Sequence, residues 1–200
     1  MLFVRHASTP GMRGARFPSG SEGADPSSLE AAARLTASLS SFETGLAFVS
    51  PARAAWETAV AMGFEPVVVA ALAEQDHGRW SGLPYEEVAV REPESFARWL
   101  ADRDAAPHGG ESRAAAAERV AHWLDERHEQ EGDSDAGRSA SGGGRGRAVV
   151  VCDVGAIRAA LGHALRADPA LFDLAPLSLT QLSAAREGWR IGYVNRKAAS

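Results

Sequence analysis

The first residues of the chain place a cation and an imidazole directly after a short apolar run. Leu2-Phe3-Val4 has no polar alternation, which is typical of a strand buried on both faces. Arg5 and His6 follow it, and small or turn-forming residues come next. In open α/β sheets, ligands bind beyond the carboxyl ends of the strands. We therefore predict that Arg5 and His6 lie at a ligand-binding edge of a sheet.

A second apolar run ends in a similar way. Leu46-Ala47-Phe48-Val49 is followed by Ser50-Pro51-Ala52-Arg53, and a helix is expected over residues 52–62. Arg53 then falls in the first helical turn, where the helix dipole opposes a cation. An anionic ligand explains an arginine at this position better than helix stability does. The pattern therefore predicts an anion site that includes Arg53.

Two further segments carry polar groups in a pattern expected of functional loops. The segment from Leu72 to Gly82 is dense in charge, histidine, tryptophan and glycine. Gly109-Gly110-Glu111 opens a long helix expected to end near His128, and glycines at a helix start leave backbone N–H groups free to face an anion. Glu111 also has a plainer explanation, since an acid in the first turn complements the dipole.

The remaining apolar runs predict the sheet. Residues 148–152 form the strongest strand, which ends at Asp153 and precedes a helix over 156–165. Residues 66–69 form another strand, and 177–182 with 190–194 suggest an antiparallel pair at the sheet edge. Helices are also expected over 84–90 and 93–100, and from a capping box that begins at Ser27. This alternation predicts an α/β fold with a mostly parallel sheet and an antiparallel edge strand.

Composition limits the class of protein. The chain has 200 residues, 45% of them hydrophobic, which suits one domain over residues 1–200. Residues 129–147 are rich in Gly, Ser and charge, and are expected to be a flexible insertion. The net charge of −5 argues against nucleic acid as a partner, and no membrane span or leader is expected. One cysteine excludes a disulfide within the chain. We expect a cytoplasmic protein.

Five short motifs, in order, resemble those of one family. They are Val4-Arg5-His6-Ala7, Ser50-Pro51-Ala52-Arg53, Glu74 within Leu-Ala-Glu-x-x-x-Gly-x-Trp-x-Gly, Gly109-Gly110-Glu111-Ser112, and the strand, turn and helix around Asp153. The chain resembles the histidine phosphatase superfamily, which has the phosphoglycerate-mutase-like fold. Its resemblance is to the compact bacterial branch of α-ribazole phosphatase-like and broad-specificity phosphatases. This implies one three-layer α/β/α sandwich.

The resemblance also implies roles for single residues. His6 corresponds to the nucleophile that forms phosphohistidine, and Arg5 and Arg53 correspond to the phosphate clamp. Glu74 corresponds to the general acid, and Thr9 with residues 109–111 would contact the substrate. The implied partner is a small phosphorylated metabolite or inorganic phosphate, bound by a monomer or homodimer. No metal-ligand spacing is present, and this chemistry needs no cofactor.

Asp153 departs from the family pattern. It stands where the family has a second histidine, which donates a hydrogen bond to a phosphoryl oxygen. An ionised aspartate only accepts, and at about 4 Å its repulsion of a phosphate charge is roughly 4 kcal/mol. Three explanations remain open: a working phosphatase that tolerates Asp153, a weak or inactive relative that binds an anion, and an engineered substitution. We rank phosphatase first, an anion-binding relative second and a phosphoglycerate-type mutase a distant third.

Overall fold

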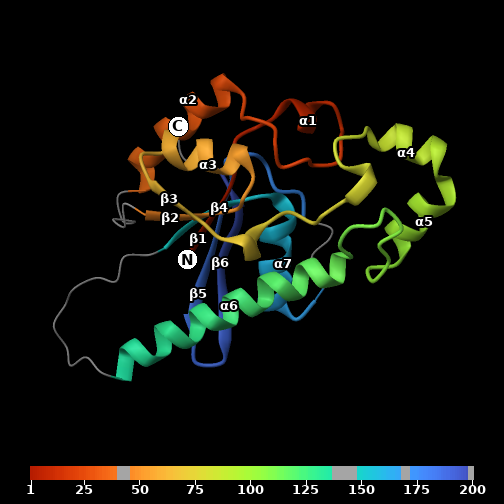
Figure 1. Cartoon of the computed structure of the whole chain (residues 1–200). Coiled ribbons are helices and arrows are strands. Elements are labelled where there is room, and N and C mark those ends of the chain that lie inside the picture. Colours follow the sequence, from red (N-terminus) through yellow and green to blue (C-terminus); the bar gives the residue numbers. More distant parts are fainter. Residues whose placement is uncertain (40–45, 137–147, 168–171, 198–200) are drawn as a thin grey trace.

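A single mixed sheet forms the centre of the computed structural model, which describes residues 1–39, 46–136, 148–167 and 172–197. The strands are β1 (Leu2–Arg5), β2 (Leu46–Val49), β3 (Glu65–Val68), β4 (Val149–Cys152), β5 (Leu179–Ala185) and β6 (Gly188–Arg196). Their order is β3-β2-β4-β1-β5-β6. β3, β2, β4 and β1 run parallel, and β5 and β6 form an antiparallel edge (Figure 1). The predicted fold class is confirmed.

Helices cover both faces of this sheet. α2 (Pro26–Leu35) and α3 (Arg53–Ala61) pack on one face, and α6 (Arg113–Ala136) and α7 (Val154–Leu165) on the other (Figure 1). Side-chain alternation in β1 joins the two layers, because Leu2 and Val4 contact the first pair of helices while Phe3 contacts the second. All three are fully buried. This explains the continuous apolar run at the start of the chain.

Two shorter helices extend the molecule beyond the sheet. α4 (Tyr85–Arg91) and α5 (Pro93–Ala101) lie to the side of the sandwich, at the right of Figure 1. They share a small core built on Phe17, Trp80 and Val88, against which Phe96 and Trp99 pack. These aromatic side chains therefore hold the α4–α5 region to the loop before α2.

The helix boundaries differ from the expected ones at three points. The N-cap of α2 is Asp25, with Pro26 in the first turn, so the capping box predicted at Ser27 was wrong. A four-residue helix, α1 (Pro10–Arg13), follows β1 in a segment of small and turn-forming residues for which no helix was expected. α6 continues through Ala136, so the beginning of the expected insertion is helical. Residues 137–147, the rest of that insertion, lie outside the described residues.

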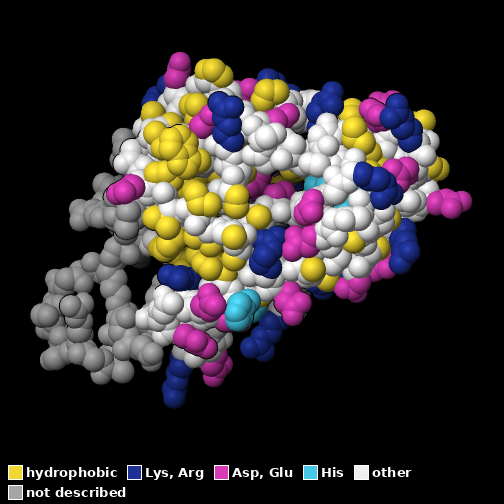
Figure 2. All heavy atoms as spheres, in the orientation of Figure 1, with side chains coloured by type: hydrophobic (Ala, Val, Ile, Leu, Met, Phe, Trp, Pro, Cys, Tyr) yellow, Lys and Arg dark blue, Asp and Glu magenta, His cyan; other side chains and the backbone are white. Residues whose placement is uncertain are grey.

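The surface combines mixed charge with a local gathering of apolar side chains. Trp56 and Val60 of α3 and Val67 and Val68 of β3 are exposed large hydrophobic residues. Figure 2 shows hydrophobic side chains gathered over this part of the face and charges of both signs elsewhere. Among the described helices, none combines the length and apolar character that a membrane crossing requires.

Candidate active site

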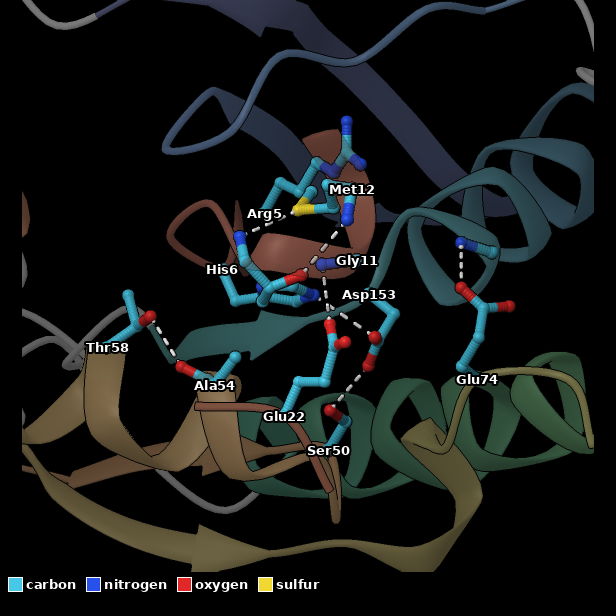
Figure 3. Close-up of polar contacts among 12 residues, drawn as sticks. Arg5, His6, Gly11, Met12, Glu22, Ser50, Ala54, Thr58, Glu74 and Asp153 are labelled. Carbon is cyan, nitrogen blue, oxygen red and sulfur yellow. Dashed lines mark hydrogen bonds and ion pairs between the residues drawn. The ribbon is translucent and has the colours of Figure 1, made fainter. Parts of the chain in front are cut away.

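A small cavity lies at the carboxyl ends of β1 and β4, which are neighbours in the sheet. Arg5, His6, Glu74, Asp153 and Thr9 all contribute to its wall. Pairing of the two strands places Arg5 opposite Cys152, and the His6 N–H donates to the Cys152 carbonyl at 3.1 Å. The two segments that follow the strands therefore face each other. The structure brings together four of the five residues predicted to be catalytic (Figure 3).

The imidazole of His6 is held by both of its nitrogens. Nδ1 lies 2.7 Å from the Ala7 carbonyl oxygen, and Nε2 lies 3.1 Å from Asp153 Oδ1 (Figure 3). A carbonyl only accepts, so the Nδ1 atom must carry a proton, and Nε2 is left as the nitrogen that could attack a ligand. The ring is only 6% exposed. This geometry fixes the orientation of a buried imidazole.

Asp153 determines the charge of that imidazole. Burial alone would lower the pKa of His6, but the hydrogen bond to Asp153 and its negative charge outweigh burial and raise it. Burial opposes ionisation of Asp153, yet His6 and a 2.8 Å hydrogen bond from Ser50 Oγ lower the pKa of this carboxyl. Each partner therefore favours the charged form of the other. An imidazolium has no lone pair with which to attack phosphorus.

Glu74 is the acid best suited to protonate a leaving group. Its carboxyl accepts the backbone N–H groups of Gln75 at 2.9 Å and Gly155 at 3.0 Å. Burial raises the pKa of Glu74, and the nearby charge of Asp153 raises it further. A side chain at position 155 would collide with this carboxyl, because an added Cβ would lie 1.9 Å from Oε1. Gly155 thus allows Glu74 to sit against the start of α7.

Arg5 and Thr9 occupy their expected places in the cavity wall. The Arg5 guanidinium donates to the Leu174 carbonyl, and its buried Nε has no partner among the described residues. Burial and the charge of Arg158 lower the pKa of Arg5. The Thr9 hydroxyl accepts the Met12 N–H at 3.3 Å and caps α1. Arg5 therefore remains available to an anion, whereas Thr9 mainly holds the loop after β1.

Arg53 differs from its expected arrangement. Its side chain is 66% exposed, does not line the cavity of His6, and pairs through Nε with Glu57 Oε1 at 2.7 Å. Glu57 lies one turn further along α3 and so reaches the same helix face. Its other oxygen accepts the Ala24 N–H at 2.7 Å, while the guanidinium packs on Gly23. In this structure Arg53 anchors the loop of residues 20–25 and does not face His6.

The glycine pair also differs from expectation. The backbone N–H groups of Gly109, Gly110 and Glu111 donate to the Ala106 carbonyl, to His108 Nδ1 and to the Asp76 carbonyl. None of the three is free for an anion. Gly110 is needed for packing instead, because an added Cβ would lie 2.1 Å from the Asp76 carbonyl oxygen. The Glu111 carboxylate pairs with Arg119 at 2.6 Å.

One acidic residue at the site gave no sequence signal. Glu22 lines the cavity of His6, and its Oε2 accepts the Gly11 N–H at 2.8 Å (Figure 3). It comes from a Gly- and Ser-rich segment in which an acid is unremarkable. Figure 2 shows a hollow near the middle of the face that it draws, with acidic and histidine side chains at its edge. Glu22 thus adds a negative charge where a phosphate would have to bind.

Replacing Glu22 with glutamine should tighten phosphate binding. The amide keeps the size of the side chain and its acceptor for Gly11, but removes one repulsive charge from the cavity. At an effective dielectric near 20, a charge about 6 Å away costs roughly 3 kcal/mol, so a decrease in Kd of about 10-fold or more is expected. Calorimetry with inorganic phosphate measures it. Glu30→Gln, on exposed α2, is the control, and equal Kd values for both variants would contradict this role of Glu22.

The chain is similar to known proteins over most of its length. The model of the histidine phosphatase superfamily (branch 1) matches residues 1–197. The glucosyl-3-phosphoglycerate phosphatase of Mycolicibacterium vanbaalenii is 33% identical over 171 residues, which cover 82% of this chain and 73% of that protein. The mycobacterial enzyme of the same name, Rv2419c, solved with VO3, superposes with a TM-score of 0.79 at 26% identity over 98% of both chains.

A shorter match concerns a longer relative. The bifunctional protein Rv2228c of Mycobacterium tuberculosis is 41% identical over 80 residues, which are 38% of this chain and 22% of that protein. The chain thus matches about a fifth of the length of that relative. The family model, in contrast, spans nearly all of the sequence and includes the segments that carry His6, Glu74 and Asp153. The chain belongs to the histidine phosphatase superfamily, branch 1.

Proposed function

We propose that this protein hydrolyses phosphomonoesters of small metabolites through a phosphohistidine on His6, and that Asp153 restrains its rate. The observation that carries the proposal is the position of His6. Its Nδ1 is fixed by the Ala7 carbonyl, and its Nε2 faces a cavity that Arg5 and Glu74 also line. A nucleophile, a cation and an acid of raised pKa are the groups that phosphoryl transfer to an imidazole requires.

The steps follow from these groups. Neutral Nε2 of His6 attacks phosphorus while Arg5 offsets the charge of the phosphoryl oxygens. The bond to the ester oxygen breaks, and Glu74 gives its proton to the departing alcohol. Glu74, now ionised, accepts a proton from water as the water oxygen attacks phosphorus. The bond to Nε2 then breaks, which releases inorganic phosphate and restores His6.

The covalent intermediate gives a direct test. A rapid acid-free quench during turnover of a labelled phosphomonoester should leave label on the protein. The bond should be labile in acid and stable in alkali, as a phosphoramidate is, and it should map to His6. The exposed His122, which pairs with Glu126 on α6, provides a matched control when replaced with glutamine. Label that persists after His6→Asn would assign the nucleophile to another residue.

A further prediction concerns Glu74. Glu74→Gln keeps the shape of the side chain but cannot transfer a proton, so turnover of an alkyl phosphate should fall about 10²- to 10⁴-fold. Phosphate binding should change little, because the amide keeps the size of the side chain and the raised pKa of Glu74 already favours its uncharged form. An aryl ester such as p-nitrophenyl phosphate, whose leaving group needs little protonation, should lose much less. Equal losses for alkyl and aryl esters would contradict an acid role for Glu74.

One set of observations favours a second function, the binding of a phosphorylated ligand with little or no turnover. Glu22 and Asp153 line the cavity of His6, and Arg53 pairs with Glu57 outside it. A site with this charge balance is poorly matched to a transferring phosphoryl group. Saturable phosphate binding without labelled His6 or product release would select this alternative. The resemblance to α-ribazole phosphatases remains a prediction that a substrate panel would test.

A further inference from the structure

Two hydroxyl groups hold the backbone that directly follows His6. The Ala7 N–H donates to Thr58 Oγ1 at 3.0 Å. The Ser8 N–H donates to Ser28 Oγ at 3.0 Å. Thr58 belongs to α3 and Ser28 to α2, which pack on the same face of the sheet. Two neighbouring helices therefore fix two successive peptide groups beside the candidate nucleophile.

The Thr58 hydroxyl can serve the Ala7 N–H only as an acceptor. It carries a single proton, which it donates to the Ala54 carbonyl at 2.6 Å, one turn earlier in α3 (Figure 3). Its oxygen is then left to accept the Ala7 N–H. Thr58 and Ala7 are fully buried, so water cannot replace either bond. Thr58 thus ties the peptide group between His6 and Ala7 to a helix.

Ser28 acts on the peptide group that faces the imidazole. The Ala7 carbonyl oxygen, which lies 2.7 Å from His6 Nδ1, belongs to the same planar peptide group as the Ser8 N–H. A hydrogen bond at one end of a planar group fixes the direction of its other end. The bond also polarises the group and strengthens its carbonyl as an acceptor. Ser28 therefore influences Nδ1 through a single peptide group.

Asp153 competes with the Ala7 carbonyl for the proton of the neutral ring. A neutral imidazole carries one N–H, but His6 faces an acceptor at each nitrogen, the Ala7 oxygen at 2.7 Å and Asp153 Oδ1 at 3.1 Å. A carboxylate is chemically the stronger acceptor, because its hydrogen bonds are charge-assisted. A proton on Nε2 would leave that nitrogen without a lone pair. The shorter contact with the Ala7 carbonyl opposes this outcome, provided that the carbonyl is held in place.

We propose that Thr58 and Ser28 are positioning residues for His6, and that they keep the proton of its neutral ring on Nδ1 against the competing carboxylate of Asp153. Within the described chain, neither residue lines the cavity of His6, so both act through the backbone. The catalytic consequence rests on the hydrolase function proposed above, since Nε2 must lack a proton to attack phosphorus. The position of the proton is a property of the protein without substrate.

Nitrogen NMR of the substrate-free protein tests this directly. With isotope-labelled histidine, at a pH where His6 is neutral, the shifts distinguish protonated from unprotonated ring nitrogens, and the His6→Asn protein assigns the signals. The wild type should carry the proton on Nδ1. Thr58→Val and Ser28→Ala should each move part of the population to Nε2, and Thr58→Ser should restore the wild-type state. Thr36→Val removes a comparable hydroxyl, which donates to the Met62 carbonyl at 2.7 Å, and is the matched control.

A double-mutant cycle on turnover separates positioning from a loss of packing. In the wild type, Thr58→Val and Ser28→Ala should each lower kcat about 10- to 100-fold with little change in KM, the range expected for a misplaced reacting group. In Asp153→Asn the competing charge is absent, so the same substitutions should cost much less. Equal losses in both backgrounds, or an Nδ1 proton that neither substitution displaces, would overturn the proposal. If His6 is never phosphorylated, the proposed function fails, whereas a proton that moves to Nε2 in Thr58→Val still supports the positioning role.

Discussion

Replacing His6 with asparagine should abolish turnover of phosphomonoesters, with a loss of about 10⁴-fold or more. The asparagine amide nitrogen can occupy the place of Nδ1 and still donate to the Ala7 carbonyl, so the local backbone contact is kept. No atom then replaces Nε2, which is the nitrogen that faces the cavity. Steady-state assays with a phosphate-release readout measure the loss. Activity retained within 10-fold of the wild type would show that another group attacks phosphorus.

The same substitution has a second, structural consequence that must be separated from the first. Without Nε2, the buried carboxylate of Asp153 keeps only Ser50 as a hydrogen-bond donor among the contacts described for it. Breaking a buried ion pair costs about 3–5 kcal/mol of folding free energy. The double variant His6→Asn, Asp153→Asn removes the stranded charge and should recover most of this stability. Turnover should stay absent in both variants, which assigns the loss to chemistry and not to unfolding.

Much of the fold follows from local sequence patterns. The apolar runs that start at Leu2 and Leu46, and the run of residues 149–152, mark strands buried on both faces, and each lies where it was expected. Their lack of alternation is explained by helices on both sides of the sheet. Helix ends were less predictable, because the Asp25–Pro26 start of α2 competes with an equally good capping sequence two residues later. Such competition is decided by packing.

The candidate site was predictable only in part. His6, Arg5, Asp153 and Glu74 follow from the rule that strand ends face the ligand, together with the family resemblance. The pairing of Arg53 with Glu57 was not predicted. Glu57 lies on the same helix at i+4 and offers a carboxylate, and the loop around Gly23 packs over both side chains. Which donors and acceptors pair across distant segments depends on tertiary contacts. The i,i+4 spacing of Arg53 and Glu57 is a local pattern, but the packing of the loop around Gly23 on them is not.

Position 153 should be the most informative site for increasing activity. Asp153→His restores a donor to the phosphoryl oxygens and removes a negative charge from the cavity. We expect turnover to rise by about 10²-fold and phosphate to bind more tightly, since one preorganised donor is worth about 10²- to 10³-fold in rate. Asp153→Asn is the matched variant, because it removes the charge and keeps the size. A smaller gain in Asp153→Asn than in Asp153→His would separate the effect of charge from that of the imidazole.

The pH dependence of these variants tests whether Asp153 restricts turnover through the charge of His6. Attack needs neutral Nε2, and Asp153 raises the pKa of His6, so wild-type kcat/KM should rise through a midpoint above the ordinary value of about 6.5. Asp153→Asn should move that midpoint to lower pH. The contribution of the His6–Asp153 pair to the stability of the fold should instead decrease as pH rises. The raised pKa of His6 makes the pair stabilising below about pH 6.5, and this contribution is lost as pH rises through the folded-state pKa.

The lowered pKa of Asp153 sets the lower pH limit of the range in which the pair stabilises the fold. The contribution of Asp153 to the free energy of unfolding is present above about pH 3.9, its ordinary pKa. It is lost as pH falls through the lowered folded-state pKa. The difference in unfolding free energy between the wild type and Asp153→Asn should therefore be largest between about pH 4 and 6.5. Under the proposed function, the same ion pair would stabilise the fold and keep a proton on His6 Nε2. An Asp153→Asn protein that gains no activity and keeps the wild-type pH midpoint would show that Asp153 does not control the protonation of His6.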